Sequence, residues 1–189
     1  DNNCYTRRSN FLVEWNIHIA ITKMIDIIDN WLPEEVFYKL FSSMKDDDFP
    51  WFLGRIVGQR GDDAEKDNMQ LSHVFYRHHQ MKQYSPIIMP TLFHLQPCAT
   101  IRIKANLSLA TDRIKVSKLH NDIEDGLDRE YLKTSILYMN TNDGYTTFED
   151  GTKVESVQNR FVTFSNSMRH AGSTCTDTPF RMIINFNYV

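Results

Sequence analysis

The amino-acid sequence predicts a mainly β fold with supporting helices, and two observations carry this prediction. Many short segments alternate apolar with polar residues and are bounded by turn residues, which is typical of strands that bury one face. The segment Thr100–Leu107 shows this alternation most clearly. Helical patterns are few and stand near the N-terminus, above all after Trp31. Together these patterns favour a sandwich-like barrel of strands with helical support.

The first hundred residues are expected to hold strands and the supporting helices. Strands are predicted over Phe11–Ile19, where His18 is interpreted as a packed core histidine, and over Lys23–Asn30. A helix is predicted to begin near Trp31. Pro33 is tolerated in its first turn, where the backbone N–H groups have no partner within the helix, and two glutamates follow at the positive end of the helix. Apolar residues recur at helical spacing: Leu32, Val36 and Leu40.

The other elements follow from the same kinds of pattern. Ile87–Phe93 is predicted to be helical or turn-like despite Pro90, and Gly61–Gln70 is predicted to be an exposed loop. Asp125-Gly126 predicts a turn. The remaining predicted strands are Phe49–Val57, His73–Tyr76, Tyr131–Asn140, Asn159–Phe164 and Phe180–Tyr188.

Length and composition are those of an ordinary globular domain. The chain has 189 residues, of which 41% are hydrophobic and 24% are charged, which is enough for one domain with a real core and short for two. The net charge of −3 and the lack of a lysine or arginine run argue against nucleic acid as a partner. No apolar stretch approaches the length of a membrane span, and no secretory signal pattern opens the chain, so no membrane is expected.

Cysteine usage indicates a reducing compartment. The three cysteines, Cys4, Cys98 and Cys175, are scattered and odd in number, and the sequence has no Cys-x-x-Cys. Neither a zinc knuckle nor a disulfide framework is therefore expected. A cytoplasmic location is the resulting prediction.

One set of residues stands out for its chemistry: His120, Asp122 and, far along the chain, His170. Two imidazoles and one carboxylate can occupy three positions on one face of an iron(II) ion and leave three open, as in the 2-His-1-carboxylate triad. His120 and Asp122 are two positions apart, so in an extended segment both side chains point the same way. His170 must then arrive from a distant strand. Arg181, 11 positions after it, offers a planar fork that binds a carboxylate.

Each of these residues has a plainer interpretation when it is taken alone. A lone His-x-Asp is common, and an isolated histidine is more often a structural or surface residue than a ligand. The doublet His78-His79 is not predicted to bind metal, because adjacent side chains on a strand diverge and no third ligand is near; His94 is left unassigned. The acidic run 46–48 is interpreted as a solvated loop, since no EF-hand pattern follows it. Only the complete set gives the motif its specificity.

In order and spacing the set resembles the Fe(II)/2-oxoglutarate-dependent dioxygenases, in particular the prolyl-4-hydroxylase-like group and its phage-encoded relatives. The resemblance implies that His120, Asp122 and His170 bind Fe(II), and that Arg181 pairs with the far carboxylate of 2-oxoglutarate. The fold it implies is a distorted double-stranded β-helix, a cupin-like jelly roll.

The resemblance is strong from about Ile101 to Tyr188 and, before that, extends only to residues 29–40. It implies a single 2-oxoglutarate/Fe(II) oxygenase domain over residues 1–189. Residues 1–100 would supply N-terminal strands and support helices, and residues 101–189 the catalytic core.

The resemblance also implies roles for residues around the triad. Tyr138 lies in a strand that resembles the family's Tyr-Leu-Asn ending, and its hydroxyl would contact the far carboxylate of 2-oxoglutarate. The segment Asn142–Phe148 stands in the place of the family's Gly-Gly-x-Thr-x-Phe, with Asp143 where the first glycine is expected. Thr146 keeps its place in this pattern and is expected to line the pocket.

Two strands are expected to supply further polar contacts. Asn185 shares one face of the last strand with Arg181 and is predicted to help it at the co-substrate carboxylate. The resemblance implies a polar contact to the co-substrate from the strand before His-x-Asp, which Asn106 or Lys104 could make. An edge strand with a solvated polar face is the alternative for that strand, and the two stay open together.

The function implied is that of a dioxygenase which uses Fe(II), 2-oxoglutarate and O2 to hydroxylate a substrate, with release of succinate and CO2. A prolyl or other peptidyl residue is the substrate that the likeness favours. A free amino acid, another small molecule or a nucleobase stays open, and the lack of a basic patch argues against the nucleobase. One alternative is a non-catalytic, metal-stabilised jelly-roll module for binding or for a virion. Another is a metal hydrolase, which would leave Arg181 and Tyr138 without a task. A monomer or homodimer is expected, in the host cytoplasm if the chain is phage-encoded.

Overall fold

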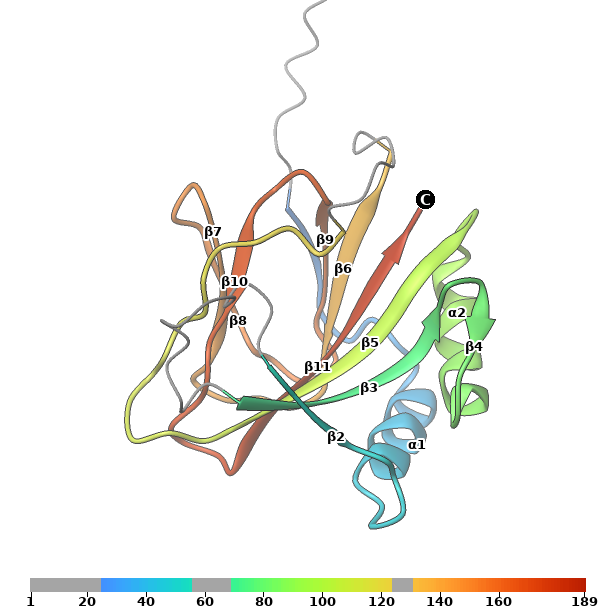
Figure 1. The fold of residues 1–189 in the computed structure, drawn as a ribbon, viewed down its shortest axis with the longest axis horizontal. Helices are drawn as coiled ribbons and strands as arrows, with labels where there is room; N and C mark the ends of the chain where they lie inside the picture. The colour runs from blue at the N-terminus through green and yellow to red at the C-terminus, as the bar shows by residue number, and fades with distance from the viewer. Residues whose placement is uncertain (1–24, 56–68, 124–130) are drawn as a thin grey trace, which may run out of the picture.

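Two antiparallel β-sheets dominate the computed structural model, which describes residues 25–55, 69–123 and 131–189 (Figure 1). A 3₁₀ helix, Ser85–Ile88, leads into the second α-helix. The helices and strands in chain order are β1 (Asp26–Ile28), α1 (Glu34–Met44), β2 (Phe52–Arg55), β3 (Met69–Arg77), β4 (Gln80–Met81), α2 (Met89–Leu95), β5 (Thr100–Leu109), β6 (Lys133–Tyr138), β7 (Tyr145–Phe148), β8 (Lys153–Glu155), β9 (Phe161–Ser165), β10 (His170–Gly172) and β11 (Phe180–Tyr188).

Some predicted features lie outside the described residues. They are the strand Phe11–Ile19 with His18, the turn Asp125-Gly126, Cys4 and most of the loop predicted over Gly61–Gln70. The strand predicted over residues 49–57 is described up to Arg55, and its regular part is β2.

The two sheets have the topology of a jelly roll. The larger sheet has eight strands, in the order β1-β9-β6-β11-β5-β3-β2, with β4 paired to β3. The smaller sheet has three, in the order β10-β7-β8. Strands far apart in the sequence are neighbours in the sheets, and all the pairs are antiparallel. Side chains from both sheets form one buried cluster between them. The predicted double-stranded β-helix is confirmed.

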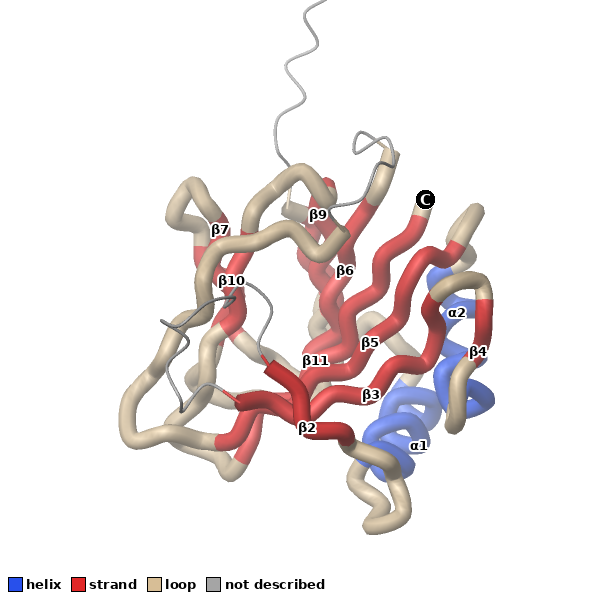
Figure 2. Tube along the Cα trace, viewed as in Figure 1, coloured by secondary structure: helices blue, strands red, loops and turns tan. Residues whose placement is uncertain are grey.

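The last strand, β11, is buried on both of its faces. Met182, Ile184 and Phe186 join the buried cluster that α1 also contributes to. Arg181 and Asn185 alternate with them and line a cavity on the other face. Figure 2 shows both helices on one side of the large sheet and the small sheet on the other. The polar side chains of β11 are therefore enclosed between the two sheets.

Both supporting helices are found where the sequence predicts them. α1 follows Pro33, has two glutamates in its first turn, and buries Phe37 and Leu40 against the large sheet. α2 accommodates Pro90 because a first turn does not need the missing N–H. Within the described ranges, neither helix has the length and apolar character that crossing a bilayer requires.

Short strands are where the prediction and the structure differ most. The strand predicted over Lys23–Asn30 is, in its described part, the three-residue strand β1, which pairs with β9. β4, β7 and β8 have two to four residues each and are not among the predicted strands. β10 is the strand predicted to carry His170, and it has only three residues. Segments of this length contain too little alternation to be distinguished from loops.

The histidine doublet forms the turn between β3 and β4. His78 and His79 have positive φ angles of 53° and 58°, as the two central residues of a type I′ hairpin turn require. Both side chains are exposed. The doublet is therefore a turn and not part of a strand.

Asn159 connects the segment before α1 to the large sheet, and its removal should destabilise the fold. Its side chain accepts a hydrogen bond from Leu32 N at 3.0 Å and donates one to Leu32 O at 2.9 Å, and its φ is 58°. We expect Asn159→Ala to lower the free energy of unfolding by about 2–4 kcal/mol, because two buried backbone groups lose their partners and alanine is strained in the left-handed region.

A urea titration measures this loss. Asn159→Gly removes the same hydrogen bonds but relaxes the backbone, so it should lose less stability than Asn159→Ala. Equal losses in the two variants would contradict the contribution of the left-handed backbone.

Candidate active site

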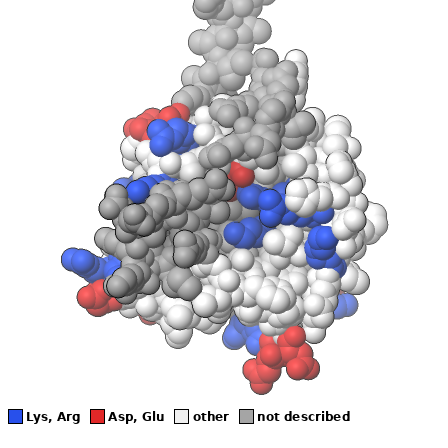
Figure 3. All heavy atoms as spheres, in the orientation of Figure 1, with Lys and Arg blue, Asp and Glu red and all other residues white. Residues whose placement is uncertain are grey.

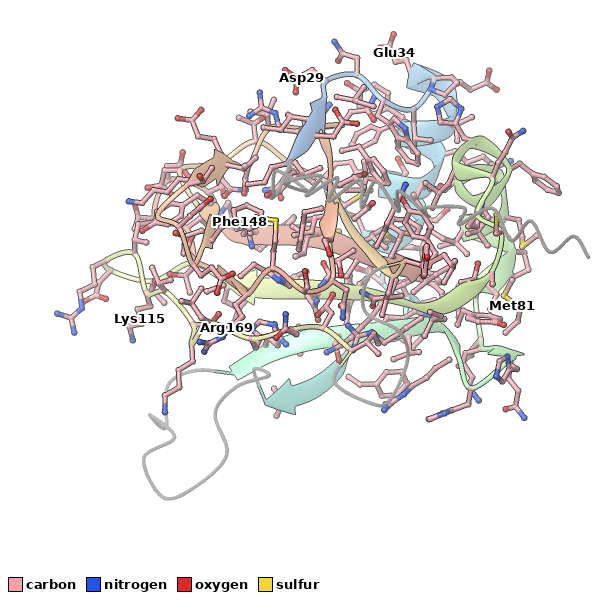
Figure 4. The ribbon with its side chains drawn as sticks, turned by 90° about the horizontal axis from the view of Figure 1, so that it is seen from above. Asp29, Glu34, Met81, Lys115, Phe148 and Arg169 are labelled. Carbon is pink, nitrogen blue, oxygen red and sulfur yellow. The ribbon has the colours of Figure 1, made fainter. Side chains whose placement is uncertain are left out.

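The residues predicted to form a site gather at one cavity between the two sheets. Its volume is about 740 Å³ including its open mouth. From above (Figure 4), Lys115 lies on a loop at the edge of the molecule and Phe148 lies in the interior. The predicted residues that line the cavity are Lys104, Asn106, His120, Asp122, Thr146, His170, Arg181 and Asn185, whereas Tyr138 is buried behind the lining.

The three predicted metal ligands come together. One ligand atom each from His120, Asp122 and His170 lies within 4.8 Å of the other two. His120 and His170 face each other in an isolated antiparallel bridge, in which each backbone N–H donates to the other carbonyl oxygen at 3.0 Å. The segment around His120 forms this single bridge and does not extend into a strand. The backbone of β10 therefore fixes the place of His120.

Both histidine rings have a nitrogen available to a metal. His120 Nδ1 lies 3.0 Å from Lys118 O; because a carbonyl only accepts, Nδ1 carries the proton and the lone pair is left on Nε2. Burial lowers the pKa of His170 and outweighs the nearby Asp122 carboxylate, which acts to raise it. The ring of Phe164 meets His170 edge-on at 4.9 Å and closes that side of the site to water.

Asp122 is held by side chains from two strands of the large sheet. Its Oδ1 lies 2.9 Å from Arg102 Nη2, and its Oδ2 accepts a hydrogen bond from Asn187 Nδ2 at 3.1 Å. Arg102 Nε in turn donates to Asn187 Oδ1 at 2.9 Å. Burial on its own would raise the pKa of Asp122, but Arg102, the two histidines and the Asn187 hydrogen bond together hold it below its usual range. The carboxylate is thus ionised, as a metal ligand must be.

Asn185 lies beside Asp122 and not beside Arg181. Its Nδ2 is 3.4 Å from Asp122 Oδ2, and its Oδ1 is buried without a hydrogen-bond partner among the described residues. The register places Asn185 opposite Lys104 and Arg181 opposite Ser108, which separates the two along β11 by about 13 Å. This position does not support the predicted part of Asn185 as a helper of Arg181.

Arg181 is enclosed toward the other end of the cavity, with 3% of its surface exposed. Its Nε donates to Ser156 Oγ at 2.6 Å and its Nη2 to Thr146 Oγ1 at 3.1 Å. In the part of the chain that the structure describes, no carboxylate lies within ion-pair distance of it. Burial lowers the pKa of Arg181, although a guanidinium stays charged throughout the physiological range. A buried cation without a counter-ion is unfavourable by itself, so this site is suited to binding an anion.

Thr146 lies between Arg181 and Tyr138. The Tyr138 hydroxyl donates to Thr146 Oγ1 at 2.7 Å, and Arg181 Cζ is 5.4 Å from the centre of the Tyr138 ring. Because Thr146 Oγ1 accepts from both Tyr138 and Arg181, its own hydrogen is left to donate to a group in the cavity. Thr146 thus forms the cavity wall in front of Tyr138, and the contact of Tyr138 with the co-substrate stays a prediction.

Gly144 lies where a side chain does not fit. A Cβ at this position would come within 2.7 Å of Arg181 Cδ and of Thr174 O. Asp143, which stands where the family pattern has its first glycine, is exposed, and its Oδ1 accepts a hydrogen bond from Thr176 N at 2.7 Å. The departure from the pattern thus falls on an exposed position, and the glycine that packs against Arg181 is retained.

The strand before His-x-Asp, β5, is a central strand. It pairs with β11 on one side and β3 on the other, so the alternative of a solvated edge strand is wrong. Lys104 and Asn106 both line the cavity. Asn106 Oδ1 is buried and has no hydrogen-bond partner among the described residues, which leaves it available to a ligand.

The other singled-out residues are not part of the cavity lining. His94 is exposed on α2, where its ring meets Trp31 edge-on at 4.9 Å. Cys98 is exposed and Cys175 is buried, and both are free thiols. No role in the site is assigned to any of these three.

Sequence reasoning missed three residues that hold the site: Arg102, Asn187 and Ser156. Arg102 and Asn187 carried a signal, because each lies on the polar face of an alternating strand. Their pairing became visible only from the register, which places them opposite each other on β5 and β11. Ser156 follows the three-residue strand β8 and carried no comparable signal.

Comparisons with known proteins bear on the fold. Neither protein-family models nor the curated proteins give a match to this chain. Among solved structures, it is similar to the viral collagen prolyl hydroxylase vCPH of Paramecium Bursaria Chlorella virus-1 in its 2OG complex, with 12% identity, coverage of 90% of this chain and 98% of that chain, and a TM-score of 0.58.

Two further structures show the same likeness. One is a prolyl hydroxylase from Trichoplax adhaerens in complex with a hypoxia inducible factor peptide fragment, at 12% identity, 88% and 84% coverage and a TM-score of 0.63. The other is an oxidoreductase of the 2OG-Fe(II) oxygenase family from Burkholderia pseudomallei, at 10% identity, 87% and 84% coverage and a TM-score of 0.62. The chain has the double-stranded β-helix fold of the prolyl hydroxylases and 2OG-Fe(II) oxygenases.

Proposed function

We propose that the protein is an Fe(II)- and 2-oxoglutarate-dependent dioxygenase that hydroxylates its substrate and releases succinate and CO2. One observation carries the proposal: Arg181, a buried cation without a carboxylate partner in the described chain, lines the same cavity as the cluster of His120, Asp122 and His170. A metal site alone does not need such a cation. A co-substrate that joins a metal-chelating keto acid to a second carboxylate matches both features.

The donor set fits Fe(II). Two imidazoles and one carboxylate are the facial triad of non-haem iron oxygenases, and the cavity in front of them leaves room for other ligands. When bound, iron supplies the oxidising chemistry together with 2-oxoglutarate and O2. The chain's own contribution is to hold the ligands: the backbone bridge positions His120 and His170, and Arg102 with Asn187 orients Asp122.

The chain also offers groups for the co-substrate. Arg181 would bind its far carboxylate, and the Thr146 hydroxyl would donate to the same group. Tyr138 and Ser156 position these two side chains. Asn106 has a free carbonyl oxygen on the cavity wall.

We extend the proposal to the substrate and the context of the protein. A prolyl or other peptidyl residue is the proposed substrate, because two of the similar structures are prolyl hydroxylases and one of them holds a peptide. A single oxygenase domain over residues 1–189, a cytoplasmic location and a monomeric or homodimeric state are retained as proposals from the sequence.

An anaerobic titration of the metal-free protein, first with Fe(II) and then with 2-oxoglutarate, tests the proposal. We expect a visible metal-to-ligand charge-transfer band when 2-oxoglutarate is added, and its loss with formation of succinate when O2 is admitted. Iron binding without the band would contradict the proposal. That result, with melting that depends on metal alone, would favour the metal-stabilised binding module.

A further inference from the structure

The described lining of the cavity carries more positive charge than the proposed function uses. It contains four basic side chains and a single acidic one, Asp122. Arg181 is assigned to the co-substrate, and Arg102 pairs with Asp122 at 2.9 Å. A divalent metal and a doubly charged 2-oxoglutarate neutralise each other, so binding both leaves the excess positive charge of the lining in place. The proposed function assigns no anion to Lys104 or Lys115.

Of these two lysines, Lys104 lies inside the large sheet, on β5. Its register partners are Asn185 on β11 and Val74 on β3. Burial lowers its pKa, and two neighbouring cations, Arg102 and Arg77, add to this effect. Asp122 acts in the opposite direction, but its two oxygens already bond to Arg102 and to asparagine side chains.

The three cations form a row away from Arg181: Arg102 and Lys104 line the cavity, and Arg77 lies beside them on β3. Arg102 is two positions before Lys104 on the same face of β5, and Arg77 lies directly opposite Arg102 on β3. We call Arg77, Arg102 and Lys104 the cationic row. Figure 3 shows Lys and Arg atoms gathered in the middle of the face over β3 and β5. Arg181 lies opposite Ser108, four positions along β5 from Lys104, so the row is separate from the co-substrate anchor.

We propose that the cationic row is a subsite for an anionic group, a carboxylate or a phosphate, on the substrate. This inference rests on the proposed function, which assigns the other anion site to 2-oxoglutarate. Like charges held this close repel one another, and an incoming anion relieves the repulsion. Lys104 is the residue that would contact the anion from the cavity wall, with Arg102 and Arg77 beside it. For a peptidyl substrate, the anion would belong to a residue next to the hydroxylated one.

The test uses the protein saturated with Mn(II) and 2-oxoglutarate, so that Arg181 is occupied and no turnover occurs. Inorganic phosphate and, in a second series, acetate are titrated by calorimetry into the wild type and into Lys104→Met. We expect one bound anion in the wild type and binding weakened by about tenfold or more in Lys104→Met. Lys104→Arg keeps the charge and Lys39→Met removes one on α1, so both should bind the anion like the wild type. The tighter of the two anions identifies the group as phosphate or carboxylate.

Three results would overturn the inference: no anion binding to the loaded wild type, equal binding by Lys104→Met, or a matching loss of 2-oxoglutarate affinity in that variant. The last result would make Lys104 a contact of the co-substrate. A failure of the proposed function is recognised separately, because the wild type would then not take up the metal or 2-oxoglutarate. In that case the same titration of the metal-free protein tests the subsite, because both Arg181 and the cationic row are then open to an added anion. Two anions should bind to the wild type and one to Lys104→Met.

Discussion

Replacing Asp122 by alanine is expected to weaken Fe(II) binding by on the order of a hundredfold or more and to abolish succinate formation. Asp122 is the sole anion of the ligand set, because an imidazole ligand carries no negative charge. The variant also leaves Arg102, which lies 2.9 Å from the carboxylate, as an unpaired cation next to the place of the metal. The loss of an attractive charge and the release of a repulsive one act in the same direction. Anaerobic calorimetry with Fe(II) measures the effect.

Two variants separate the charge of Asp122 from its packing and from general effects. Asp122→Asn keeps the size of the side chain and its place between Arg102 and Asn187, so it should retain the fold while it loses the metal. Asp143→Asn removes an exposed carboxylate outside the cavity lining and should bind Fe(II) like the wild type. A folded Asp122→Ala protein with wild-type iron affinity would remove Asp122 from the ligand set.

The part of the site that was predictable depends on residue type and on strand parity. His120, Asp122 and His170 could be singled out because two imidazoles and a carboxylate suit iron(II). Arg181 could be singled out because its distance after His170 resembles that in the prolyl-4-hydroxylase-like group. Strand parity then placed Asn106 and Lys104 on one face of β5, and the structure puts both in the cavity lining. These inferences need only the chemistry of the side chains and a period of two.

The unpredictable part depends on which strands are neighbours and in what register. Asn185 shares a face with Arg181, yet the register places it at Asp122. The contact between Arg102 and Asn187 joins residues 85 positions apart, and nothing local to either one specifies the other. The bridge between His120 and His170 similarly replaces a strand that local pattern would favour. Pairing between distant segments depends on the whole sheet. Helices and strands can therefore be predicted from one sequence more readily than the contacts between their side chains.

The Arg181→Gln variant is expected to lose about 2–5 kcal/mol of 2-oxoglutarate binding, because it removes one partner of an enclosed charge pair. This loss raises the Kd by a factor of about 30 or more. Fe(II) affinity should stay close to that of the wild type, since Arg181 contacts Ser156, Thr146 and Ser173 O and none of the metal ligands. Anaerobic titration of the charge-transfer band measures the affinity for 2-oxoglutarate, and calorimetry measures the affinity for iron.

Arg181→Lys is the matched control for charge. It keeps the cation but loses the planar fork, so its affinity for 2-oxoglutarate should fall between those of the wild type and Arg181→Gln. This order would mean that the buried cation binds an anion, because a purely structural arginine would affect folding and both affinities together. Unchanged 2-oxoglutarate affinity in a folded Arg181→Gln protein would remove the anchor and, with it, the observation on which the proposed dioxygenase rests. The cavity would then be a metal site without a co-substrate, as the metal-stabilised binding module requires.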